Sequence, residues 1–223
     1  MNSTRDILQH HFYNPNYLYF LISLVLLILV PPFASLSVSG QLIFKLTFAL
    51  VLLMGSFYVS TSYIEMFIAM VLSTFIFIFF IQNEEQVFNL IATFSNLLLF
   101  GFLFVRLMTY LLKRDRVDTN SLYASISAFL VLGIVGMPLA STIEHYFPGA
   151  YELPEAHTYY DFLYYCYITI TTVGYGDITP VHPLAKALAI LLSISGQLYI
   201  TFVVAIIIGK YLVDELEEDK IDE

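Results

Sequence analysis

The residues with the clearest chemistry are six in a row, Thr172-Val173-Gly174-Tyr175-Gly176-Asp177. Glycine adopts left-handed backbone conformations without the penalty that a Cβ atom imposes, so Gly174 and Gly176 allow the chain to alternate in handedness. Such alternation turns consecutive carbonyl groups to one side, where a ring of oxygens can replace the water shell of a cation. The valine and the tyrosine would brace this ring from the side. The Thr172 hydroxyl would add an oxygen at its inner end.

The apolar stretch Tyr159–Thr171 comes directly before this motif and must position it. A helix of this length rises only about 20 Å, which is too short to cross about 30 Å of hydrocarbon. We therefore predict a re-entrant helix that enters the membrane and returns on the same side, surrounded by protein or water. Its C-terminal end would carry a partial negative charge that favours a dehydrated cation.

The composition points to a membrane as the solvent of this chain. Hydrophobic residues make up 59% of the 223 residues and charged residues only 12%, whereas soluble domains carry about 25% charged residues. We therefore predict an all-α membrane protein. The net charge of −9 argues against nucleic acid as a partner. The single cysteine, Cys166, excludes a disulfide within the chain.

Long apolar runs predict six membrane-crossing helices, at Tyr17–Val30, Leu42–Val59, Tyr63–Ile81, Val87–Leu112, Leu122–His145 and Pro183–Val213. We expect Pro31 and Pro32 to end the first of them. These runs divide the chain into a four-helix transmembrane domain (1–112), a cytoplasmic linker (113–120), a domain that contains the re-entrant helix (121–213) and a short acidic tail (214–223).

The basic residues indicate how the helices are oriented, because cytoplasmic loops carry an excess of Lys and Arg. They cluster after the fourth predicted helix, at Lys113, Arg114 and Arg116, and Lys210 lies at the end of the sixth. The opposite loops are acidic, at Glu84, Glu85, Glu144, Glu152 and Glu155. We predict a multi-pass protein of the plasma membrane with both termini in the cytoplasm.

The sequence T-V-G-Y-G, with Thr171 before it and Asp177 after it, resembles the selectivity filter of the tetrameric potassium-channel family. The run Gly196–Thr201 resembles the two-transmembrane pore module of bacteria, which suggests a prokaryotic source. The resemblance implies a homotetramer in the bilayer that conducts potassium ions passively, without an organic cofactor and without enzymatic activity. The alternatives are a non-selective cation channel on the same fold and a subunit of a potassium transporter.

Two positions in the re-entrant helix depart from the family. Relatives often carry a glutamate where this chain has Ile168, and a tryptophan bonded to the aspartate after the filter where this chain has Tyr165. We expect the Tyr165 hydroxyl to bond Asp177 instead, so that replacing Tyr165 with Phe would loosen the filter.

The last predicted helix carries candidate gating residues. Gly196 is either a hinge, as in relatives, or a site of close helix packing. Ser193, Gln197 and Thr201 share one helix face, which either lines a cavity below the filter or bonds a neighbouring helix. Further along, Val204 or Ala205 and then Ile208 would narrow the inner mouth and gate by dewetting.

The first four predicted helices have the layout of a voltage sensor without its charges. Steep voltage sensing needs three or four charges per subunit inside the membrane field, and the fourth helix offers only Arg106 within its apolar length. We predict no steep voltage gating. Arg106 either pairs with Glu65 or extends to the lipid headgroups. A separate regulatory partner is possible and has no support in the sequence.

Overall fold

The computed structural model describes residues 16–34, 40–60, 62–82, 86–114, 117–155 and 157–219. Its helices are α2 (Leu18–Ala34), α3 (Gly40–Tyr58), α4 (Tyr63–Gln82), α5 (Gln86–Lys113), α6 (Thr119–Tyr146), α7 (Tyr159–Ile170) and α8 (Pro183–Asp219). Two short strands, β1 (Tyr151–Glu152) and β2 (Thr179–Pro180), pair antiparallel on either side of α7 in the sequence. The predicted Glu84, Glu85 and Arg116 lie outside the described residues.

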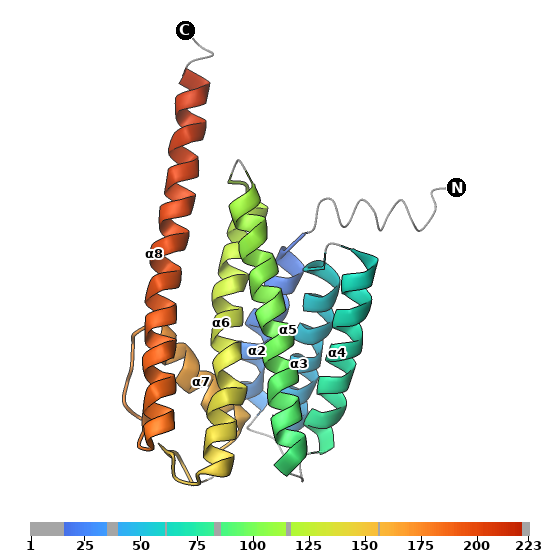
Figure 1. Cartoon of the computed structure of the whole chain (residues 1–223), viewed down its shortest axis with the longest axis vertical. Coiled ribbons are helices and arrows are strands. Elements are labelled where there is room, and N and C mark those ends of the chain that lie inside the picture. The colour runs from blue at the N-terminus through green and yellow to red at the C-terminus, as the bar shows by residue number, and fades with distance from the viewer. Residues whose placement is uncertain are drawn as a thin grey trace, which may run out of the picture.

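The long helices run side by side and the short α7 lies among them (Figure 1). Helix α7 packs against both α6 and α8. Helix α8 extends beyond the other helices, at the end of the molecule where α5 passes into α6. The β1–β2 pair therefore joins the loop between α6 and α7 to the loop between α7 and α8.

Three segments of the described chain are long and apolar enough to cross a membrane: Thr93–Lys113, Thr119–Tyr146 and Pro183–Lys210. Three shorter apolar helical segments lie at Leu18–Phe33, Leu42–Tyr58 and Tyr63–Thr74. The helix bounds agree closely with the apolar runs of the sequence, except that α2 continues to Ala34 and α8 to Asp219. The structure is thus all-helical apart from the two short strands, within the residues that it describes.

The helices of the N-terminal half share one apolar core. Leu99, Leu103 and Leu107 lie at intervals of four along α5 and are fully buried, as expected for residues on one helix face. Phe48 of α3 packs its ring against Phe100 of α5 at a centroid distance of 5.8 Å. Helix α5 also packs along α6, and α2 contacts α6. Helices α2 and α5 are therefore packed directly onto α6.

The expectation that Pro31 ends the first helix is wrong, because α2 continues through both prolines to Ala34. A proline lacks the N–H that would bond the carbonyl four residues earlier, so Pro32 leaves the carbonyl of Ile28 without its usual helical donor. The hydroxyl of Tyr160, in α7, donates to this carbonyl at 3.1 Å. A side chain from α7 thus replaces the missing N–H as the donor to this carbonyl.

Helix α6 begins with a well-formed cap at Asp118. The Asp118 carboxylate accepts hydrogen bonds from the backbone N–H of Ser121 at 2.8 Å and from its hydroxyl at 2.6 Å. Partial burial by itself would raise the pKa of Asp118, but the bonds from Ser121 and the charge of Arg114 outweigh it and lower the pKa. The carboxylate is therefore ionised at neutral pH, where it favours the N-terminus of α6.

Candidate functional site

The backbone of the 172–176 motif alternates in handedness. The φ angles of Thr172, Gly174 and Gly176 are 60°, 52° and 80°, whereas the two residues between them do not have positive φ. Thr172 is the only non-glycine residue with positive φ in the described chain. The sequence explained the two glycines, but it gave no sign that Thr172 takes the same strained conformation.

The side chains of the motif have little to pack against within one chain. All residues from Thr171 to Asp177 are exposed, with 51% of Val173 and 74% of Tyr175 accessible. An exposed segment with a strained backbone and large apolar side chains is unusual, because backbone strain persists only where the surrounding structure holds it in place.

Helix α7 holds the start of the motif through backbone bonds. The N–H of Thr172 donates to the carbonyl of Thr169 at 3.0 Å, and the N–H of Gly174 donates to the carbonyl of Ile168 at 3.1 Å. At the other end of α7, the Asp161 carboxylate accepts from the N–H of Thr158 at 2.6 Å and completes a capping box. The helix is therefore fixed at both ends, and the motif leaves its C-terminus in a defined direction.

Helix α7 docks on α6 at two glycines. A Cβ atom on Gly133 would lie 2.3 Å from the ring of Tyr167, and one on Gly136 would lie 2.7 Å from the sulfur of Cys166. The Tyr167 hydroxyl also donates to the carbonyl of Leu130 at 2.8 Å. Small residues let two helices approach closely in this way, and the bond fixes the rotation of α7 about its axis.

The predicted bond between Tyr165 and Asp177 is not present. The Tyr164 hydroxyl donates to Asp177 instead, at 2.7 Å. Tyr165 is buried with its ring 5.2 Å from that of Tyr151, and its hydroxyl has no hydrogen-bond partner among the described residues. Adjacent residues of a helix point about 100° apart, so the docking of α7 decides which tyrosine faces the returning chain.

Gly196 of α8 lies directly against the last turn of α7. A Cβ atom at this position would lie 2.0 Å from the carbonyl oxygen of Ile170. Helix α8 is continuous through Gly196, from Pro183 to Asp219. Of the two interpretations from the sequence, close packing is the one that this geometry supports, and a hinge at Gly196 remains a proposal.

One residue of the polar face of α8, Gln197, contacts the motif. The Gln197 side-chain amide donates to the Thr172 hydroxyl oxygen at 3.4 Å, and the Thr201 hydroxyl donates to the Gln197 backbone carbonyl at 2.8 Å. Further along, Val204 and Ile208 are exposed in the single chain. The residues predicted to line a cavity and a gate therefore follow one another along one open face.

Part of this chain, which includes the motif, matches a family of known proteins. Residues 126–213 match the family described as ion channels. These residues are related to the ion channels. No solved structure matches the chain.

Two curated potassium channels are similar to part of this chain, whose residues 126–213 are called the ion-channel segment below. The calcium-gated potassium channel TvoK of Thermoplasma volcanium is 28% identical over 82 residues, which are 37% of this chain and 22% of the relative. Two-pore potassium channel 5 of Arabidopsis thaliana is 32% identical over 109 residues, or 49% of this chain and 25% of the relative. The chain thus covers only about a quarter of these relatives. The matches confirm the resemblance to potassium channels and a non-enzymatic family.

The contact between Tyr164 and Asp177 predicts a specific effect on the ion-channel segment. Replacing Tyr164 with Phe removes the hydroxyl that braces Asp177, at a cost of about 1 kcal/mol for an accessible bond. In the channel proposed below, we expect the mean open time of single channels in planar bilayers to fall roughly fivefold. Tyr165→Phe is the matched control, because it removes a hydroxyl without a partner and should leave the open time unchanged. A larger effect of Tyr165→Phe would restore the bond expected from the sequence.

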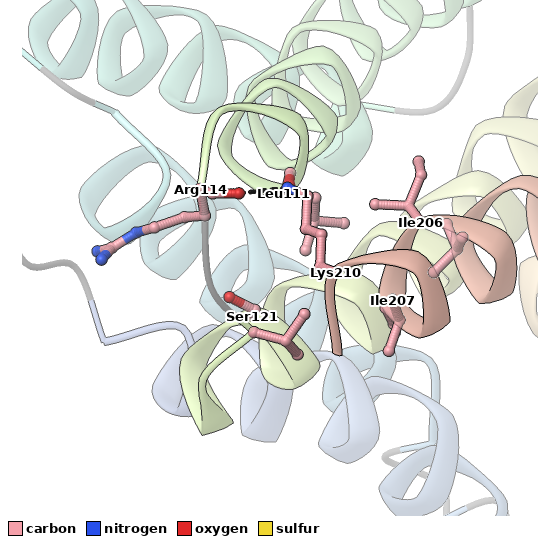
Figure 2. A pocket seen from close by; sticks show the side chains of 8 residues that line it. Leu111, Arg114, Ser121, Ile206, Ile207 and Lys210 are labelled. Atoms are coloured by element: carbon pink, nitrogen blue, oxygen red, sulfur yellow. Dashed lines mark hydrogen bonds between the residues drawn. The ribbon is translucent and has the colours of Figure 1, made fainter. Parts of the chain in front are cut away.

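A small pocket lies where the C-terminal part of α8 meets the end of α5 and the start of α6. It is lined by Leu111, Arg114, Val117, Ser121, Val203, Ile206, Ile207 and Lys210. Figure 2 shows Lys210 reaching from α8 to the end of α5. Its ammonium group donates to the carbonyls of Leu111 at 2.6 Å and Leu112 at 3.2 Å, and to that of Arg114. The last carbonyls of a helix lack N–H donors from the helix itself, and Lys210 provides the donor at the end of α5. The sequence predicted that Lys210 lies at the cytoplasmic end of its helix, and it did not identify this contact.

Removing the Lys210 donors should loosen the C-terminal part of α8. Lys210→Met keeps a long side chain and removes all three hydrogen bonds, so we expect a loss of about 1–3 kcal/mol in the free energy of unfolding. Thermal unfolding of the purified protein in detergent measures it. Lys186→Met changes an exposed lysine near the N-terminus of the same helix and should have little effect. Equal stability of the two variants would show that the contact contributes nothing.

Arg106 and Glu65 form an ion pair between α5 and α4. Their side chains are 27% and 26% exposed, and the guanidinium group also lies 5.6 Å from the centre of the Phe102 ring. The paired arrangement, rather than extension of Arg106 toward the headgroups, is the one present. A paired arginine of this kind holds two helices together.

Proposed function

We propose that this chain is one subunit of a homotetrameric potassium-selective channel in which Thr172–Gly176 of four copies form the selectivity filter. The observation that carries the proposal is the alternation of handedness at Thr172, Gly174 and Gly176. This pattern points consecutive carbonyl oxygens toward one axis, as needed to replace the hydration shell of potassium. Thr171, Asp177 and Tyr164, which donates a hydrogen bond to Asp177, would support the filter on the side away from the pore axis.

The exposed motif supports the tetramer. A strained strand with 74% of Tyr175 accessible needs neighbours, and cyclic assembly of identical chains would supply them. Much of α8 is likewise exposed and apolar, so its face would meet the pore and the adjacent copies. Ser193, Gln197 and Thr201 would line the cavity, and Val204 with Ile208 would form the gate.

The architecture proposed around this pore has six membrane-crossing helices, α2 to α6 and α8, with both termini in the cytoplasm of a plasma membrane. Residues 1–112 would form a peripheral domain, 113–120 a linker, 121–213 the pore domain and 214–223 a tail. The pairing of Arg106 with Glu65 supports a structural role for this arginine, which favours a channel without steep voltage gating.

The test is reconstitution of the purified protein into bilayers with potassium on one side and sodium on the other. A potassium-selective pore gives a reversal potential far from zero, in the direction set by the potassium gradient. A reversal potential near zero would indicate a non-selective cation channel. Flux that saturates without unitary currents would indicate a transporter, and a monomeric purified protein would exclude the proposed filter.

A further inference from the structure

One contact joins the filter motif to the last helix through side chains. The amide nitrogen of Gln197 lies 3.4 Å from the hydroxyl oxygen of Thr172, a long hydrogen bond between residues far apart in the sequence. The neighbouring residue, Gly196, is pressed against the backbone of Ile170. Ile170 ends α7 just before the motif. The close contact of Gly196 with Ile170 therefore fixes the position of α8 along the motif and holds Gln197 beside Thr172.

The other partners of Thr172 are also fixed. Its backbone N–H donates to the Thr169 carbonyl at 3.0 Å, and its φ of 60° orients the side chain in a way that an extended residue would not. The main chain of Thr172 is therefore held by α7, while its hydroxyl is met by α8. The contact with Gln197 acts on the one side-chain oxygen that the filter motif offers to a cation.

We propose that Gln197 is a positioning residue that weakens cation binding at the innermost oxygens of the filter, an inference that rests on the proposed function. A threonine hydroxyl oxygen has two lone pairs. One of them accepts the Gln197 N–H, so only one remains for a dehydrated cation. The amide hydrogen also brings a partial positive charge next to that oxygen, which opposes a cation there.

Weaker binding at this point favours conduction. A pore must bind ions well enough to admit them and weakly enough to release them. In a fourfold assembly, four Gln197 amides would surround the inner end of the filter, each acting on the Thr172 of its own chain. The ring would lower the residence time of an ion at the last site before the cavity, on the side from which internal ions enter.

Thr201 provides the matched control on the same face. Its hydroxyl donates to the Gln197 backbone carbonyl at 2.8 Å, so it is satisfied within α8 and does not reach the motif. Changing Thr201 to Val alters the polarity of the same helix face by a similar amount and leaves the Gln197 amide in place. An effect specific to Gln197 therefore separates the contact with Thr172 from a general change in the polarity of the cavity.

The probe is block by barium applied from the inner side. Barium is close in size to potassium and has twice the charge, so it binds the same oxygens and leaves slowly. Gln197→Met preserves the length of the side chain and removes the donor. Gln197→Asn keeps the amide but shortens its reach by one methylene. We expect both Gln197 variants to bind internal barium about tenfold more tightly than the wild type, and Thr201→Val to shift barium affinity by less than about twofold.

A double-mutant cycle assigns the effect to the contact. Thr172→Val removes the hydroxyl with little change in shape, and in this background Gln197→Met should change barium affinity by less than about twofold. The proposal is wrong if neither Gln197 variant tightens the block, or if the full effect persists without the Thr172 hydroxyl. Gln197→Asn retains a polar side chain and so tests the contact even where methionine disturbs assembly. If the wild type is potassium-selective and the Gln197 variants leave its barium affinity unchanged, this inference alone is rejected. A non-selective wild type rejects the proposed function.

Discussion

Replacing Gly196 with alanine should abolish assembly of the functional protein. The added Cβ atom would lie 2.0 Å from the carbonyl oxygen of Ile170, 2.8 Å from its carbonyl carbon and 2.9 Å from its Cα. These are backbone atoms at the end of α7, so no side-chain rotation relieves the overlap. Overpacking of this kind costs about 1–3 kcal/mol or more per site, and it would force α8 away from the start of the filter motif. Yield of the assembled species by size-exclusion chromatography and potassium flux in liposomes measure the loss.

Two other glycines serve as controls for the Gly196 variant. A Cβ atom on Gly209, in the same helix, or on Gly101, in α5, would meet nothing within 4 Å. Alanine is the better helix former by about 1 kcal/mol, so these variants should be neutral or slightly stabilised. If Gly196 acts only as a hinge, Gly196→Ala will instead assemble normally and change only the open probability. That outcome would reject close packing as the reason for this glycine.

The sequence predicted the helices and the motif well because both depend on local information. The apolar runs predicted the bounds of α5, α6 and α7 to within a few residues, since helix length in a bilayer follows from hydropathy. The glycines at 174 and 176 predicted positive φ at those positions. For the same reason the family resemblance was visible from T-V-G-Y-G alone.

The contacts that the sequence did not predict join residues far apart in the chain. The choice of Tyr164 over Tyr165 depends on the rotation of α7, which Gly133 and the Tyr167 hydroxyl fix against α6. The passage of α2 through Pro32 depends on a donor from Tyr160. A proline in a helix does signal a free carbonyl, but the identity of the donor comes from the fold.

The largest effect on selectivity should come from Gly174→Ala. The φ of Gly174 is 52°, and an L-residue pays about 1–2 kcal/mol to hold a left-handed conformation. Nothing lies within 4 Å of the added Cβ atom in one chain, so the cost is conformational. Four copies around one axis raise it to about 4–8 kcal/mol for the assembly. The 172–176 segment then lowers its conformational energy by rotating its peptide groups, and this rotation turns carbonyl oxygens away from the ion. We expect the reversal potential between potassium and sodium to move close to zero, or the current to disappear.

Gly149→Ala separates the role of the filter from the backbone penalty itself. Gly149 has a φ of 82° and likewise nothing within 4 Å of an added Cβ atom, but it lies in the turn between α6 and β1. Its N–H donates to the Glu144 carboxylate at 2.7 Å, and alanine keeps this donor. This variant should therefore lose about 1–2 kcal/mol of stability per chain and retain the wild-type reversal potential. If both alanine variants change the reversal potential equally, the strain acts through global stability. If Gly174→Ala keeps wild-type selectivity, the 172–176 backbone is not what solvates the ion.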